Sequence, residues 1–293
     1  MINERREYLP SGEILGQARR VLQAHREGEI DWVTFLASSE PALHARLGRM
    51  IRGIKTLTAI TVAVIANGAL LYDPEVQQEL MAADAVLPSL DAGTAALYRA
   101  INRPHPACTF DRLVNGLLSF RRLYRGKMWV EVMLVKGLND TESALRELTR
   151  ILDALGPDQV HITTPVRPPA EAWVEPPDQE GLQRARSILG AHAPVHKETA
   201  ETPPVRGFDN LQEALTAIVS RHPMTKEELA RTLCNWPEDE VARTLERLRD
   251  NGTLQTVRGF GKEFWASGRA RFAEARTKHQ PSLPGRRLRQ YWE

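Results

Sequence analysis

One residue in this sequence that could do chemistry is Glu40, which follows the run Asp31-Trp-Val-Thr-Phe-Leu-Ala-Ser-Ser. The apolar and β-branched residues of this run are typical of a buried strand, and a helical pattern begins directly after Pro41. A carboxylate at that position could bind an amine or another cation. The alternative is that Glu40 is an ordinary carboxylate in the first turn of a helix, where it interacts favourably with the helix dipole.

Polar side chains follow the later strand-like runs as well. These are Asn67, Ser89 with Asp91, Lys136 with Asn139, and Arg167. Because the carboxyl ends of parallel strands meet at one edge of a sheet, such residues are expected to gather into a site. Asparagine and aspartate also favour turns, however, and Lys136 with Asn139 fits a loop and a helix start. Arg167 is either an anion contact or a surface arginine.

Helical and strand-like patterns alternate through the first 198 residues. Helices are expected at about 11–27, 42–57, from 74, 109–124, 141–155 and 178–189. Strands are expected from 31 and at 59–66, 85–90, 128–135 and 159–166, with a short one around 195. This alternation predicts an α/β fold with a parallel sheet or barrel.

The rest of the chain has a different pattern. A Pro-rich linker is expected at 199–210, followed by helices at 211–221, from Thr225, and at 237–251. A hairpin at 253–266 comes next. Three helices and a hairpin predict a small winged helix-turn-helix domain at 211–268. The polar, basic residues 269–293 are expected to form a flexible tail.

The composition excludes several classes of protein. The 293 residues carry a formal net charge of +2, and no run of 18 or more apolar residues could cross a membrane. The first residues lack the apolar core of a signal peptide. Cys108 and Cys234 lie too far apart for a disulfide framework or a metal cluster, and the eight histidines lack metal-binding spacing. A cytoplasmic protein without membrane contact is expected.

Six short pieces occur in a characteristic order, each at a strand end or just after one. They are Ser39-Glu40-Pro41, Ala66-Asn67-Gly68, Pro88-Ser89-Leu90-Asp91-Ala92, Ile101-Asn102-Arg103-Pro104, Glu131 with Val135-Lys136-Gly137 and Asn139-Asp140, and Arg167-Pro168-Pro169. On these pieces, residues 4 to about 176 resemble the radical S-adenosylmethionine (SAM) superfamily. They look closest to a subgroup in which a helix-turn-helix follows the radical SAM domain.

The resemblance implies a cofactor pair and a set of contacts. SAM would lie across the C-terminal strand ends of a partial TIM-like barrel and chelate one iron of a [4Fe–4S] cluster, which cleaves SAM reductively to a 5′-deoxyadenosyl radical. Glu40, with Ser39 beside it, matches the segment that binds the SAM amino group. The residues that match contacts to the ribose and carboxylate of SAM are Asn67, Ser89, Asp91, Glu131 and Arg167.

The sequence departs from the superfamily in two places. It contains no Cys-x3-Cys-x2-Cys motif, and neither of its two cysteines can replace one. We therefore expect an N-terminally truncated, partial (βα)6 barrel that lacks its first strand, so that the strand at Asp31 becomes an exposed edge prone to association. In addition, Ser39 stands where related proteins have glycine. This chain alone is expected to be inactive.

Three functions remain open. The chain could be a radical SAM enzyme acting on an unknown substrate, a catalytically dead module that binds SAM or a partner, or a nucleic-acid-binding regulator. Residues that could neutralise phosphates in the winged helix are Arg243, Arg247, Arg258 and Lys262. The acidic start of the same helix, Glu238-Asp239-Glu240, is unfavourable for DNA. Docking to the barrel or to another protein is therefore favoured over binding to DNA.

Overall fold

The computed structural model describes residues 4–26, 28–36, 40–190, 208 and 210–272. Ser39, most of the expected linker, the expected strand around 195 and nearly all of the expected tail lie outside the described residues. Within them the chain forms two compact units. One holds residues 4–164 and 176–190, and the other holds 165–175 together with 208–272.

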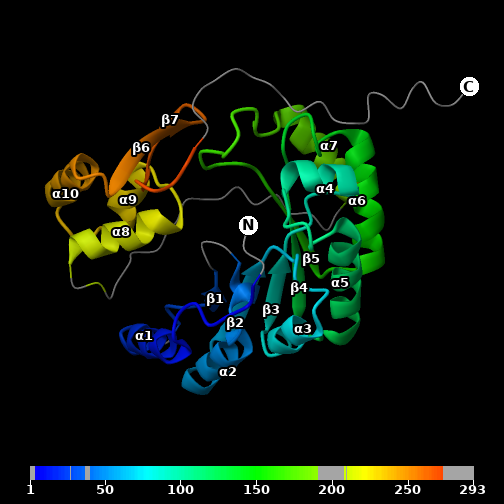
Figure 1. Cartoon of the computed structure of the whole chain (residues 1–293), viewed down its shortest axis with the longest axis horizontal. Helices are drawn as coiled ribbons and strands as arrows, with labels where there is room; N and C mark the ends of the chain where they lie inside the picture. Colours follow the sequence, from blue (N-terminus) through cyan, green and yellow to red (C-terminus); the bar gives the residue numbers. More distant parts are fainter. Residues whose placement is uncertain (1–3, 27, 37–39, 191–207, 209, 273–293) are drawn as a thin grey trace, which may run out of the picture. The chain divides into compact units, whose positions relative to one another are not determined.

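The first unit contains a parallel sheet in the order β1-β2-β3-β4-β5 (Figure 1). Its strands are β1 (Trp32–Phe35), β2 (Thr61–Ala66), β3 (Ala85–Pro88), β4 (Lys127–Met133) and β5 (Gln159–Thr163). Its helices are α1 (Ser11–Gln23), α2 (Leu47–Leu57), α3 (Pro74–Leu80), α4 (Ala95–Ile101), α5 (Phe110–Leu123), α6 (Glu142–Leu155) and α7 (Gln179–Leu189), with a short 3-10 turn, η1 (Pro41–Leu43). The predicted α/β fold with a parallel sheet is confirmed.

In β4 and β5, alternate residues face a buried core. Along β4 the residues Met128, Val130 and Val132 are fully buried, whereas the residues between them are partly exposed. This period of two places one face of the sheet against apolar side chains and leaves the other face open. The helices α5 and α6 lie beside the sheet in Figure 1.

The open face of the sheet is concave. The ring centroids of Trp32 on β1 and Trp129 on β4 are 5.3 Å apart, although two strands lie between them. In a flat sheet, strands three positions apart are separated by roughly 14 Å. The sheet must therefore curve toward the tryptophans, as the wall of a partial barrel does. His161 on β5 stacks on Trp129 and extends this aromatic cluster.

Three helical regions differ from the predictions. The helix expected at 11–27 ends at Gln23. The helix expected at 42–57 is divided, because His44 is extended (φ −78°, ψ 112°) and separates η1 from α2. The helix α4 was not predicted from the sequence; the Thr94 side chain caps it by accepting the Leu97 N–H.

The second unit contains α8 (Leu211–Arg221), α9 (Lys226–Thr232), α10 (Glu238–Asp250) and an antiparallel hairpin of β6 (Leu254–Gly259) and β7 (Lys262–Ser267). Thr225 and Glu228 form the expected capping box at the start of α9. These elements lie where the sequence placed three helices and a hairpin. Their assignment as a winged helix stays a prediction.

The segment Pro165–Glu175 belongs to the second unit, whereas the sequence pattern places it in the barrel. Arg167 forms a salt bridge with Glu228 at 2.6 Å, and both side chains are largely buried. Gly259 allows Pro168 to come close, since an added Cβ would lie 2.9 Å from the Pro168 Cα. These contacts could not be read from the sequence, because 61 residues separate Arg167 from Glu228.

In the part of the chain that the structure describes, no helix combines the length and the apolar character that crossing a bilayer requires.

Candidate functional site

Glu40 lies just after β1, at the start of the η1 turn. One carboxylate oxygen, Oε1, accepts the N–H of Ala42 at 2.9 Å, and Oε2 accepts the N–H of Asn67 at 2.6 Å. The first bond makes Glu40 the N-cap of η1, so the helix-start interpretation is correct. The second bond joins the end of β1 to the end of β2. The two interpretations of Glu40 are therefore compatible.

The Glu40 carboxylate is buried, with 7% of the residue exposed. Burial raises the pKa of this carboxyl, and the backbone N–H groups of Asn67 and Ala42 oppose that shift. No salt bridge to Glu40 occurs among the described residues. A carboxylate offers about four acceptor positions. Two of them are used by the backbone, so Glu40 retains acceptor capacity for a ligand.

A cavity of about 110 Å³ lies beside this carboxylate. Its walls include Glu40 and Asn67, the apolar residues Leu43 and Leu70, and a group from the region of α4 and α5: Tyr98, Asn102, His105 and Cys108. Burial raises the pKa of the Cys108 thiol, which Arg112 opposes and Glu40 reinforces. The sequence resemblance had marked Asn102 only as part of a motif and had left Tyr98, His105 and Cys108 unassigned. Tyr98 lies on α4, an unpredicted helix, and His105 and Cys108 follow it, which explains the omission.

Asn67 contributes mainly through its backbone. Its N–H binds Glu40, while its side-chain Oδ1 accepts the N–H of Ala69 at 2.9 Å and stabilises the turn after β2. The turn-forming role that the sequence left open for Asn67 is therefore present, whereas its predicted contact to SAM stays a prediction.

Asp91 is surrounded by structural hydrogen bonds. Its Oδ1 accepts the N–H of Met133 at 2.8 Å, and its Oδ2 accepts the Asn102 amide at 2.7 Å. Its backbone carbonyl accepts the Asn139 amide at 2.7 Å. Asp91 is 5% exposed, burial raises its pKa, and it does not line the cavity beside Glu40. It therefore ties the end of β3 to the end of β4.

The remaining predicted contacts are dispersed. Ser89 and Glu131 are joined by a β-bridge that continues the pairing of β3 with β4, and neither lines the cavity.

Lys136 pairs with Asp178 at 3.1 Å, and Asn139 accepts the N–H of Val135. Arg167 belongs to the second unit. The structure thus brings Glu40 and Asn67 together, and the SAM contacts of all these residues stay predictions.

The described residues do not provide ligands for an iron–sulfur cluster. No group of three or more His, Cys, Asp or Glu side chains among them could hold a metal ion. Cys108 is buried in the first unit and Cys234 is exposed in the second. A [4Fe–4S] cluster needs several thiolates in one place. The residues present therefore do not fit this group.

The predicted nucleic-acid contacts have protein partners in part. Arg243 pairs with Asp239 at 2.8 Å, one turn earlier on α10, and Arg247 donates to Gln212 at 3.2 Å. Arg258 and Lys262 lie on opposite strands of the hairpin, next to its turn. DNA binding stays a prediction, which a gel shift that disappears at raised salt would support.

Comparisons with known proteins found relatives of this chain in sequence. No family model matches the chain. A UPF0026 protein of Methanocaldococcus jannaschii is 28% identical over 236 residues, which are 79% of this chain and 73% of that protein. A protein named GTPase Obg from Brachyspira hyodysenteriae is 31% identical over 251 residues, 85% of this chain. The chain spans 36% of the length of that protein.

A solved structure shares the architecture. The radical SAM methyltransferase from Sphaerobacter thermophilus is 24% identical, with a TM-score of 0.51, and the match covers 64% of this chain and 57% of that one. Its likeness concerns the fold. The first unit therefore has the fold of the radical SAM superfamily, and the resemblance found in the sequence is confirmed at that level.

Proposed function

We propose that the first unit binds SAM and that the Glu40 carboxylate accepts its ammonium group. The observation that carries this proposal is a buried carboxylate at the C-terminal end of a parallel strand, held by two backbone N–H groups and lining a cavity. An ammonium group supplies both the positive charge and the N–H donors that such a carboxylate lacks. In a site shielded from water this charged hydrogen bond is strong.

The role of the protein in binding follows from the same contacts. The N–H groups of Ala42 and Asn67 fix both carboxylate oxygens, so little orientational freedom is lost when a ligand binds. The apolar side chains of Leu43 and Leu70 exclude water from the ammonium–carboxylate pair. In the superfamily a [4Fe–4S] cluster supplies the electron that cleaves SAM. The residues described here do not fit that cluster, so the proposal extends to binding only.

The test is calorimetric titration of the chain with SAM and with two relatives of SAM. S-adenosylhomocysteine retains the ammonium group, whereas 5′-methylthioadenosine lacks the whole amino acid. We expect the first two to bind and the third to bind at least tenfold more weakly, since one charged hydrogen bond contributes about 1.5–3 kcal/mol.

Two variants complete this experiment. Glu40→Gln removes the charge and nearly preserves the shape, and it should weaken SAM binding about tenfold. Glu142→Gln is the matched control, because Glu142 is an exposed carboxylate that pairs with Arg146 on the surface of α6. Equal SAM affinity in the wild-type chain and the Glu40→Gln variant would reject the proposal.

A further inference from the structure

A segment near the start of the chain holds the turn that carries Glu40. Residues 4–10, here called the N-terminal strap, run beside η1. The Arg6 N–H donates to the Leu43 carbonyl at 3.1 Å, and the Ala45 N–H donates to the Arg6 carbonyl at 3.0 Å. The His44 ring donates through Nε2 to the Leu9 carbonyl at 2.9 Å, while its Nδ1 accepts the Arg46 N–H. The strap is thus bonded on both sides of the end of η1.

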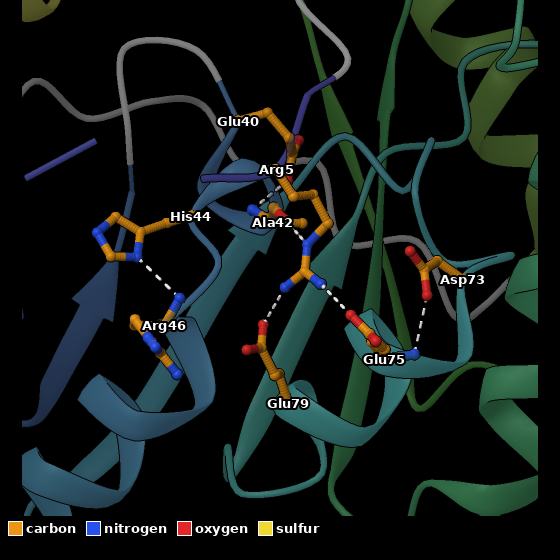
Figure 2. A network of polar contacts seen from close by, with 8 residues as sticks. All are labelled: Arg5, Glu40, Ala42, His44, Arg46, Asp73, Glu75 and Glu79. Carbon is orange, nitrogen blue, oxygen red and sulfur yellow. Dashed lines mark hydrogen bonds and ion pairs between the residues drawn. The ribbon is translucent and has the colours of Figure 1, made fainter. Parts of the chain in front are cut away.

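Arg5 makes the central side-chain contacts of the strap (Figure 2). Its Nε donates to the Ala42 carbonyl at 3.0 Å. Its two terminal nitrogens pair with Glu75, at 3.2 Å, and with Glu79, both on α3. Ala42 is also the residue whose N–H holds Glu40. One peptide unit on each side of the Ala42 Cα is therefore fixed, the first by Glu40 and the second by Arg5.

Glu79, the second partner of Arg5, lies where α3 packs closely against α2. An added Cβ at Gly48 of α2 would lie 2.9 Å from the Cα of Glu79, so α3 approaches α2 closely at this point. Glu79 has 20% of its side chain exposed, and Glu75 has 84%. Burial raises the pKa of Glu79, and Arg5 opposes that shift. Glu79 is therefore the sheltered partner, and Glu75 contributes little because water screens it.

We propose that Arg5 is a positioning residue for Glu40. It transmits the fixed position of α3 to the Ala42 peptide, and Ala42 in turn orients the Glu40 carboxylate toward the cavity. The expected effect of Arg5 on SAM binding rests on the proposed function. Its structural part, the control of Glu40 by Arg5, can be measured on the chain without any ligand.

The experiment measures the pKa of Glu40 by carbon-13 NMR of its carboxyl in the wild-type chain and in three variants. Arg5→Gln should raise the Glu40 pKa, because the Ala42 N–H bond that stabilises the carboxylate weakens. Glu79→Gln is the decisive variant. Loss of a nearby negative charge by itself lowers the Glu40 pKa, whereas loss of the support of Arg5 raises it. We expect a rise. Arg49→Gln, an exposed arginine on α2, is the matched control and should leave the pKa unchanged.

SAM affinity is measured on the same proteins and on one further variant, Arg5→Lys, after circular dichroism has established that each is folded. Arg5→Gln and Glu79→Gln should each bind SAM three- to tenfold more weakly, and Arg5→Lys should restore only part of the affinity because one ammonium cannot replace the guanidinium fork. An unchanged or lowered Glu40 pKa in Glu79→Gln overturns the inference, even if SAM binds. If the pKa shifts appear but the wild-type chain does not bind SAM, the proposed function fails and the positioning role stands.

Discussion

Glu40 and Asp91 are both buried carboxylates, and they follow the ends of β1 and β3 in one parallel sheet. Their exposures are 7% and 5%, and burial raises the pKa of each. Their partners differ. Asp91 binds the backbone of β4 and the amide of Asn102, and it has no place in the cavity wall. Among the described residues, Glu40 binds two backbone N–H groups, and it lines the cavity.

The difference shows what separates a structural carboxylate from one that can bind a ligand. Both oxygens of Asp91 are turned to groups that the fold itself must satisfy, so the residue joins two strands. The oxygens of Glu40 are held at a turn, and its remaining acceptor capacity faces space. Position after a strand is common to both residues. The cavity, which Glu40 lines and Asp91 does not, distinguishes them.

The largest expected effect is the loss of stability in Asp91→Ala. The Met133 N–H and the Asn102 amide would be left buried without their acceptor, which should lower the free energy of unfolding by about 3 kcal/mol. Glu40→Gln should change it by less than about 1 kcal/mol, because the amide oxygen can still accept one N–H. Urea denaturation of both variants measures the contrast. An equal loss of unfolding free energy in both variants would contradict the distinction between the structural Asp91 and the ligand-binding Glu40.

The pH dependence of binding should single out Glu40. Because burial raises its pKa, the carboxylate becomes protonated while the pH is still above the ordinary glutamate range of about 4.3. Affinity for an ammonium ligand should therefore fall about tenfold per pH unit below the raised pKa. Protonation of Glu40 also raises the free energy of unfolding as the pH falls from the raised pKa toward about 4.3. Above the raised pKa this stabilisation is absent. Calorimetry at several pH values should show a flat profile for Glu40→Gln.

Exchanging the groups at Asp91 and Asn102 should preserve most of the stability. In the double variant Asp91→Asn with Asn102→Asp, residue 91 still accepts the Met133 N–H, and its new amide donates to the carboxylate at 102. We expect a free energy of unfolding within about 1 kcal/mol of the wild-type value. A loss as large as that of Asp91→Ala would mean that the charge at position 91, rather than the hydrogen-bond pattern, is what matters.

The smallest effect is expected for the side chain of Asn67. Its Oδ1 supports only the Ala69 N–H, and the bond to Glu40 comes from its backbone. Asn67→Ala should therefore change SAM affinity less than about twofold and stability by about 0.5–1 kcal/mol. A tenfold loss of affinity with unchanged stability would assign a direct ligand contact to the side chain.

The sequence predicted the strands and the position of Glu40 after the first of them, because apolar runs, proline and capping residues are local signals. It could not separate Glu40 from Asp91, since both have the same local pattern. The partners of Asp91 lie 11 and 42 residues away, and such contacts depend on the completed fold. Arg5 was part of the resemblance but had no role assigned, because its partners on α3 are 70 and 74 residues distant.

The segment Pro165–Glu175 affects how the chain can be divided for experiments. A fragment cut in the expected linker at 199–210 would keep Arg167 and lose Glu228, and it would keep Pro168 without the glycine that it packs against. The other fragment would carry a largely buried glutamate stripped of its arginine, which is a costly arrangement. Either half expressed alone would therefore lack contacts that it has in the full chain. Studies of the second unit should retain residues 165–175, joined to residue 208 by a designed linker.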